Sequence, residues 1–359
     1  MLTEIAVQDN QAVAAGHFGE IWKGVFRGRP VCMKVVKVYQ KSDVAKLLKA
    51  FCREAILWSQ LSHPNLLPFY GIHRLDDTIG RICLIAPWME NGCLPDYLIK
   101  RTGANRFALA KDICNGLQHL HNHGIVHGDL KGVNVLVTQS GRACVADFGL
   151  SSVSESDVTR WSSFVSSTVP GGTARWQAPE LFNPDVDIIK PTKMSDIYSL
   201  GCVFYEIFTG RIPFYEAPRE PTVISWVQAG KKPSKPSHES PSFTEWGLSD
   251  ALWKSCIEEA WARAPEERAT IPYLILKLAK CSQPQNPSSP EDDTKDGHDG
   301  DSWLSPADVR NSVRRSTPKT PVPSARGSAK DISGLAEGSI RDGERGSAAS
   351  WLEWFPISI

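Results

Sequence analysis

The chain has 359 residues, 41% of them hydrophobic, and carries 40 basic and 40 acidic side chains. A net charge of zero gives no electrostatic reason to expect a nucleic acid or an anionic membrane surface as a partner. Nine cysteines without a C-x-x-C pair are typical of reduced thiols rather than of a disulfide framework. The sequence contains no apolar run of transmembrane length and no signal peptide. We therefore expect a cytoplasmic protein, with the nucleus as the alternative location.

The N-terminal part of the chain predicts a sheet crossed by one helix. Residues 13–26 alternate apolar and polar side chains around glycines, a turn follows at 27–30, and residues 31–36 form a second apolar strand. Residues 42–61 then carry apolar side chains at helical spacing. This order predicts an antiparallel sheet with a helix packed on it.

Helical patterns dominate from Leu94 onward, for example over residues 107–121 and 195–208. Strands followed by helices indicate an α+β fold with two lobes. After residue 281 the sequence is rich in Ser, Pro, Gly and charged residues, with almost no apolar content until Trp351. Such a segment buries too little surface to offset its ordering entropy, so residues 282–359 are predicted to be a disordered tail.

The run IVHGDLKGVNVL (125–136) is the most informative stretch of the chain. It places a carboxylate, an amine and an amide close together, at Asp129, Lys131 and Asn134. Phosphoryl transfer needs a carboxylate for the incoming hydroxyl, a cation for the moving phosphate and an amide for magnesium. Thirteen residues after Asn134, the turn Asp147-Phe148-Gly149 supplies a second carboxylate. The run therefore predicts a phosphoryl-transfer site.

A glycine-containing turn lies between two of the predicted strands, at residues 14–21 (AAGHFGEI). Glycines there let backbone N–H groups approach phosphate oxygens. The strand Val31-Cys32-Met33-Lys34 follows, and a lysine in an apolar strand needs a partner for its ammonium group. Each signal alone is weak, because glycine turns and surface lysines are common.

Together these motifs resemble the eukaryotic protein kinases, in particular Ser/Thr kinases of the tyrosine-kinase-like group. The resemblance covers about residues 5–281 and implies a bilobal kinase domain, with an N-lobe at about 5–88 and a C-lobe at about 92–281. Ala14 departs from the family's glycine-rich loop, in which a glycine occupies that position. The activity implied is transfer of the γ-phosphate of ATP to protein substrates, with Mg²⁺ as the cofactor.

The resemblance also assigns roles within the active site. It implies that Asp129 orients the substrate hydroxyl and accepts its proton, that Lys131 contacts the γ-phosphate, and that Asn134 and Asp147 hold Mg²⁺. It implies that Lys34 binds the α- and β-phosphates of ATP and pairs with Glu54 on the predicted helix. The remaining nucleotide contacts implied by the family motifs are Gly16, Phe18, Gly19, Ile21, Pro87 and Met89.

The segment Ile85–Gly92 resembles the family's hinge, in which backbone groups of Pro87 and Met89 bind adenine. Ala86 is then an unusually small residue at the gatekeeper position, the position that borders the pocket behind the adenine. One hypothesis is that the indole of Trp58 fills the volume that Ala86 leaves, since cores tolerate swaps that conserve volume. The alternative is that Trp58 packs elsewhere between the helix and the sheet.

Two positions bear on specificity and two on rival functions. At Lys131 and Thr173 the chain resembles the Ser/Thr kinases, which carry these residue types at the corresponding positions, rather than the tyrosine kinases. Gly128 replaces the family's arginine before the catalytic aspartate, which predicts activity that does not need activation-loop phosphorylation through that arginine. Gly128 and Ala14 also support the alternative of a pseudokinase scaffold, and a dual-specificity or tyrosine kinase is a further alternative.

The C-lobe resemblance implies two structural contacts, an anchor from Asp196 to the catalytic loop and an ion pair between Glu180 and Arg268. His119, His121 and His123 alternate near the end of a predicted helix, where we expect solvated side chains rather than a metal site. In the tail, the apolar segment 351–356 is a candidate for docking on a partner protein or on the kinase domain, and an undocked end is the alternative.

Overall fold

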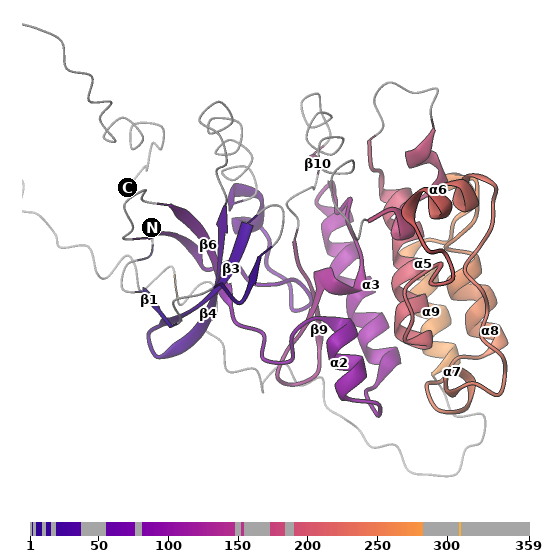
Figure 1. The fold of residues 1–359 in the computed structure, drawn as a ribbon, viewed down its shortest axis with the longest axis horizontal. Helices are drawn as coiled ribbons and strands as arrows, with labels where there is room; N and C mark the ends of the chain where they lie inside the picture. The colour runs from indigo at the N-terminus through magenta and orange to yellow at the C-terminus, as the bar shows by residue number, and fades with distance from the viewer. Residues whose placement is uncertain are drawn as a thin grey trace, which may run out of the picture. The chain divides into compact units, whose positions relative to one another are not determined.

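Strands come first in the structure and helices follow, as the α+β prediction requires (Figure 1). The structure is a computed structural model, and every residue that it describes falls within one compact unit, Met1–Thr317. The described residues are 2, 5–8, 12–15, 19–36, 55–75, 81–147, 152–153, 173–183, 190–282 and 309. Within these ranges no helix is long and apolar enough to span a bilayer.

The N-lobe is built on an antiparallel sheet with the strand order β1-β3-β4-β6-β5, in which β2 pairs with the start of β3. Its strands are β1 (Ile5–Val7), β2 (Ala14–Ala15), β3 (Gly19–Phe26), β4 (Arg29–Val36), β5 (Gly71–Arg74) and β6 (Ile82–Pro87). Arg27 and Gly28 link β3 to β4 with φ angles of 53° and 74°. Two positive φ values suit a tight hairpin whose twist matches its strands. The predicted turn is confirmed, although β4 already begins at Arg29.

The C-lobe is mainly helical. Its α-helices are α2 (Leu94–Lys100), α3 (Arg106–Asn122), α5 (Lys193–Thr209), α6 (Glu220–Gln228), α7 (Pro241–Thr244), α8 (Asp250–Leu252) and α9 (Ile271–Cys281). Short helical turns occur at η2 (Gly132–Asn134), η3 (Thr173–Trp176), η4 (Pro179–Phe182), η5 (Trp253–Glu258) and η6 (Pro265–Glu267). Its short strands are β7 (Ile125–Val126), β8 (Val135–Val137), β9 (Ala143–Val145) and β10 (Ser152–Val153).

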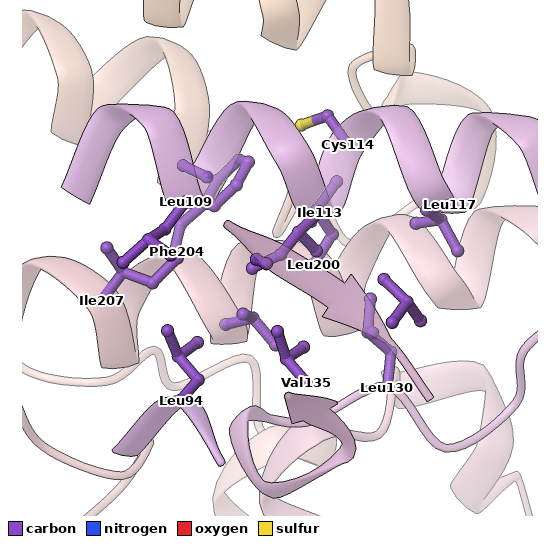
Figure 2. Packing of buried hydrophobic residues seen from close by; sticks show 14 of the residues in the cluster. Leu94, Leu109, Ile113, Cys114, Leu117, Leu130, Val135, Leu200, Phe204 and Ile207 are labelled. Atoms are coloured by element: carbon purple, nitrogen blue, oxygen red, sulfur yellow. The ribbon is translucent and has the colours of Figure 1, made fainter. Parts of the chain in front are cut away.

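Helices α3 and α5 form the centre of the C-lobe core and confirm the helices predicted over 107–121 and 195–208. Asn105 caps α3 by accepting a hydrogen bond from the Ala108 N–H, and a reciprocal Thr192–Ser195 capping box begins α5. Between the two helices pack aliphatic and aromatic side chains at i, i+3 and i+4 spacing (Figure 2). Leu130, in the loop between β7 and η2, belongs to the same cluster, so this loop packs on the core.

The helix predicted over residues 42–61 is described only at its end, where residues 55–59 are helical. The remainder of that prediction, including Glu54, lies outside the described residues. So does the predicted tail, apart from Ser282 and Val309. Val309 is 1% exposed and belongs to a hydrophobic cluster of the N-lobe.

Candidate active site

The loop that contains His127 and Gly128 is fixed to the start of α5 by one buried carboxylate. Asp196 is 1% exposed, and its two oxygens accept hydrogen bonds from the backbone N–H groups of His127 at 2.8 Å and Gly128 at 2.9 Å. His121 also contacts Asp196, with Nε2 2.8 Å from Oδ2. The predicted Asp196 anchor is confirmed. The expectation of a solvated His121 is wrong, because the ring is buried against this carboxylate at the end of α3.

Gly128 has a φ of 77°, in the left-handed region that an L-residue with a side chain occupies at a cost. Glycine therefore removes backbone strain directly before Asp129. This conformational effect of Gly128 is separate from the missing arginine charge that the family resemblance implies.

Asp129 presents one oxygen that is fixed and one that is not. Its Oδ2 lies 2.8 Å from Lys131 Nζ and accepts a hydrogen bond from Asn134 Nδ2 at 3.0 Å. Its Oδ1 is buried and has no hydrogen-bond partner among the described residues. Because an unpaired buried acceptor is costly, the geometry favours an external donor at this position, such as a hydroxyl group.

Lys131 connects the catalytic loop to the segment at η3. Its Nζ contacts Asp129 and also donates to Thr173 Oγ1 at 3.1 Å. In the sequence, Lys131 and Thr173 are two separate indications of Ser/Thr specificity. In the structure they are hydrogen-bonded to each other, and Lys131 in turn contacts Asp129.

Oxygen groups suitable for a hard divalent cation lie at the other end of the loop. Asn134 uses its Nδ2 to donate to the Asp129 carbonyl at 2.8 Å, so its amide oxygen is not consumed by that bond. The Ala146 N–H donates to the Asn134 carbonyl at 2.9 Å, which places residue 134 beside the strand end that leads into Asp147. Carboxylate and amide oxygens fit Mg²⁺. Among the described residues there is no cluster of three or more His, Cys, Asp and Glu that could hold a metal ion.

Lys34 on β4 reaches across to Asp147, with Nζ 2.7 Å from Oδ1. The attraction of this ammonium is the main reason why the pKa of Asp147 is lowered from its ordinary value. Asp147 is therefore ionised at neutral pH, the state in which a carboxylate can bind a cation. The predicted pairing of Lys34 with Glu54 lies outside the described residues.

The nucleotide-binding predictions fall along β3, β4 and β6. Ile21 is the direct cross-strand neighbour of Lys34, and Gly19 begins β3. Pro87 ends β6, and Met89 follows it, largely buried. The Trp88 N–H donates to the Pro30 carbonyl at 3.2 Å and the Gly92 N–H to the Met89 carbonyl at 3.0 Å, which fixes the hinge backbone. Gly16 and Phe18 lie outside the described residues.

A family model described as protein tyrosine and serine/threonine kinase matches residues 7–278. The chain belongs to this family. It is 32% identical to serine/threonine-protein kinase STY46 of Arabidopsis thaliana over 67% of the chain and 40% of that protein. Serine/threonine-protein kinase STY17 and serine/threonine/tyrosine-protein kinase HT1 of the same plant are 29% and 28% identical, over 74% and 75% of the chain and 43% and 65% of those proteins. The chain thus spans less than two thirds of each of these relatives.

These matches confirm that the chain is a eukaryotic protein kinase of the tyrosine-kinase-like group, with the α+β bilobal fold that the motifs predicted.

The predicted ion pair of the C-lobe, between Glu180 and Arg268, is confirmed as well. Arg268 has a side chain that is 0% exposed, and it binds both oxygens of Glu180, at 2.7 and 2.6 Å. It also donates to the backbone carbonyls of Met194 and Ala262. This bidentate pair joins η4 to the loop before α9.

Glu206 lies next to the candidate site but was not among the residues that the sequence predicted. It lies within α5, is 5% exposed, and its Oε2 accepts from the Gly132 N–H at 2.9 Å and from Trp176 Nε1 at 2.7 Å. Burial raises the pKa of Glu206 to about 7, although both hydrogen bonds and the Lys131 charge oppose the rise. A Cβ on Gly132 would lie 2.6 Å from Glu206 Oε1, so only glycine permits this approach. The signal in the sequence was a single carboxylate inside an otherwise apolar helical pattern.

The gatekeeper hypothesis is neither confirmed nor contradicted by the kinase structure. Trp58 and Ala86 belong to the same buried cluster. The Trp58 indole donates from Nε1 to the Leu67 carbonyl at 2.6 Å and stacks on Phe69 with ring centroids 5.0 Å apart. These contacts anchor the indole to the segment before β5. Whether it also fills the volume beside Ala86 stays a prediction.

Proposed function

We propose that this chain is an active protein kinase that transfers the γ-phosphate of ATP to serine or threonine side chains of protein substrates. The observation that carries the proposal is Asp129, whose Oδ2 is fixed by Lys131 and Asn134, while its buried Oδ1 has no hydrogen-bond partner among the described residues. In this proposal Oδ1 receives the substrate hydroxyl, orients it towards the γ-phosphate and takes its proton. Lys131 places a positive charge where negative charge on the transferred group must be stabilised.

The nucleotide would be held from the N-lobe side. We assign Lys34, paired with Glu54, to the α- and β-phosphates, and backbone groups of Gly16, Phe18 and Gly19 to the phosphate-covering turn. Ile21 would contact the nucleotide from β3, with the Pro87 carbonyl and the Met89 N–H at the adenine. The short distance from Lys34 to Asp147 supports this assignment, because the phosphates would lie beside the cation ligands.

Asn134 and Asp147 would hold Mg²⁺. When bound, the ion would supply positive charge that offsets part of the negative charge of the phosphates. The contribution of the protein is the arrangement of the two ligands. Asn134 is oriented by its bond to the Asp129 carbonyl, and Lys34 keeps Asp147 ionised by lowering its pKa.

Serine/threonine specificity is supported by the Lys131–Thr173 hydrogen bond, which ties the substrate-side segment η3 to the catalytic carboxylate. The names of the relatives agree, with HT1 named for tyrosine as well. We propose a kinase domain over residues 5–281, and a cytoplasmic location is supported by the free thiols of the eight described cysteines. Docking of tail residues 351–356 on a partner lies outside the described residues.

Separate measurements of binding and transfer test the proposal against the pseudokinase alternative. Full-length wild type and Asp129→Asn are titrated with a fluorescent ATP analogue and then assayed for transfer from labelled ATP, with Mg²⁺ and with excess chelator. We expect similar nucleotide binding by both proteins, and transfer only by the wild type with Mg²⁺. Equal binding with no transfer above Asp129→Asn would establish the scaffold alternative instead.

A further inference from the structure

The N-lobe sheet has an apolar face that is turned away from the active site. Along β4, Val31, Met33 and Val35 point to this outer face, while Cys32 and Lys34 alternate with them towards the cleft. On β6, Cys83 and Ile85 belong to the outer-face cluster, whereas the intervening Leu84 belongs to the main core. The register pairs Met33 directly with Ile85. The outer face is therefore a continuous apolar surface across two central strands.

This face is covered. Val31, Met33, Val35, Cys83 and Ile85 are each 0% exposed. A sheet face reaches such burial only when other groups pack over it. Among the described residues outside the sheet, two of the apolar side chains in this cluster come from distant parts of the chain, Leu2 and Val309. The Leu2 N–H donates to the Ile72 carbonyl at 2.7 Å, so Leu2 is fixed at the β5 side.

We propose that the outer face of the N-lobe sheet is a docking surface for the chain's own C-terminal segment, residues 303–313, with Val309 as the anchor. Val309 is 1% exposed in the outer-face cluster and has a helical backbone. Val309 is the only residue after Ser282 that the structure describes, and it lies in the outer-face cluster. The segment around Val309 is therefore the occupant that we propose for this face.

The sequence around Val309 fits a short amphipathic helix. Ser305-Pro306-Ala307-Asp308 places a capping hydroxyl, then proline at the first helical position, then an acid at the third. Val309 and Val313 are four residues apart and would share one face of the helix. Arg310 and Arg314 come directly after them and would lie beside that face. An apolar helix face laid on an apolar surface is a recurring mode of peptide recognition.

The linker is long enough for docking within one chain. The 26 residues between Ser282 and Val309 reach roughly 90 Å when extended. A domain of about 280 residues has a diameter of roughly 50 Å. The end of α9 can therefore connect to the outer face of the sheet without strain.

The location has a functional consequence. Each outer-face side chain on β4 is one residue away from a cleft-facing side chain, and β6 leads directly into the hinge at Pro87. A segment docked on the outer face stiffens from behind the two strands that carry Lys34 and the hinge. The C-terminal segment is thereby coupled to the nucleotide site without entering it.

Alkylation of Cys83 tests the docking. Its thiol belongs to the same buried cluster as Val309, and Cys114 in α3 is an equally buried reference in the C-lobe. Full-length wild type, Val309→Asp and Val309→Ala are treated with N-ethylmaleimide under native conditions, and each cysteine is followed by peptide mass spectrometry. We expect Cys83 in Val309→Asp to react about tenfold faster, the factor typical of losing one buried valine from a local opening equilibrium. Val309→Ala should give a smaller increase, and Cys114 should not change.

Two controls keep the result interpretable. Ile99→Asp introduces a carboxylate at a side chain that is 77% exposed on α2, and should leave Cys83 as slow as in the wild type. A synthetic peptide of residues 302–315 should restore slow Cys83 labelling in Val309→Ala and Val309→Asp, whereas the same peptide carrying Val309→Asp should not. Unchanged Cys83 reactivity in both variants, or failure of the wild-type peptide to protect Cys83, would overturn the proposal.

Discussion

The replacement Glu206→Gln probes the link between the catalytic loop and the substrate-side segment. Glu206 holds Gly132, which follows Lys131, and Trp176, which ends η3. Glutamine keeps a carbonyl oxygen that can accept both hydrogen bonds but removes the titration. The variant therefore separates the contribution of the contacts from the contribution of the charge.

The magnitude follows from the pKa of Glu206, which moves from 4.5 to about 7 on folding because the carboxyl is buried. The folded protein binds this proton more tightly than the unfolded chain does. The free energy of unfolding therefore falls as the pH rises from 4.5 through 7, and above pH 7 the ionised group costs about 3 kcal/mol. Between pH 5.5 and pH 8 the difference amounts to about 2 kcal/mol.

Urea unfolding at pH 5.5 and pH 8 measures this effect. From pH 5.5 to pH 8 the free energy of unfolding of the wild type should fall by about 2 kcal/mol relative to that of Glu206→Gln, because glutamine does not titrate. Trp176→Phe is the matched control, because it removes the hydrogen bond that lowers the pKa of Glu206 and should move the pH dependence to higher pH. An identical difference between Glu206→Gln and wild type at both pH values would refute the reasoning, since Glu206 would then titrate alike in the folded and unfolded states.

Three further predictions concern the scaffold and the hinge. Glu180→Ala leaves the buried Arg268 guanidinium without its carboxylate and should lower the free energy of unfolding by about 3–5 kcal/mol, measured by urea unfolding, whereas a loss under 1 kcal/mol would show that backbone carbonyls suffice. Gly128→Arg forces a side chain onto a φ of 77° and should cost about 1–2 kcal/mol. Its kinase activity should also become dependent on activation-loop phosphorylation; equal activity before and after phosphatase treatment argues against that role. Ala86→Met should weaken ATP binding through a clash that Trp58→Leu relieves, and a double variant no better than Ala86→Met rejects the compensation hypothesis.

The sequence indicated which polar groups of the candidate site lie together, because these groups fall in short runs with fixed spacing. Asp129, Lys131 and Asn134 fall within one loop, and the structure brings them into direct contact. The Asp196 anchor and the Glu180–Arg268 pair were also predictable, since the motifs around them are local. Helices α3 and α5 followed from their apolar periodicity.

The features that the sequence did not predict depend on contacts between distant segments. Glu206 becomes significant only when folding places Gly132 and Trp176 against it, and nothing in a helical pattern indicates which buried acid will be bonded. His121 looked like one of three solvated histidines until α5 brought Asp196 to it. Val309 lies in a segment whose overall composition predicts disorder, yet its own side chain is buried in the outer-face cluster, a contact that composition cannot indicate.

Phosphoamino-acid analysis of the transferred label tests the central claim most directly. The full-length chain is incubated with labelled ATP, Mg²⁺ and a mixed protein substrate, beside Asp129→Asn, and the products are hydrolysed and separated. An Asp129 site linked through Lys131 to Thr173 predicts label on phosphoserine and phosphothreonine, and none above background from Asp129→Asn. Label found mainly on phosphotyrosine, or equal labelling by the two proteins, would contradict it.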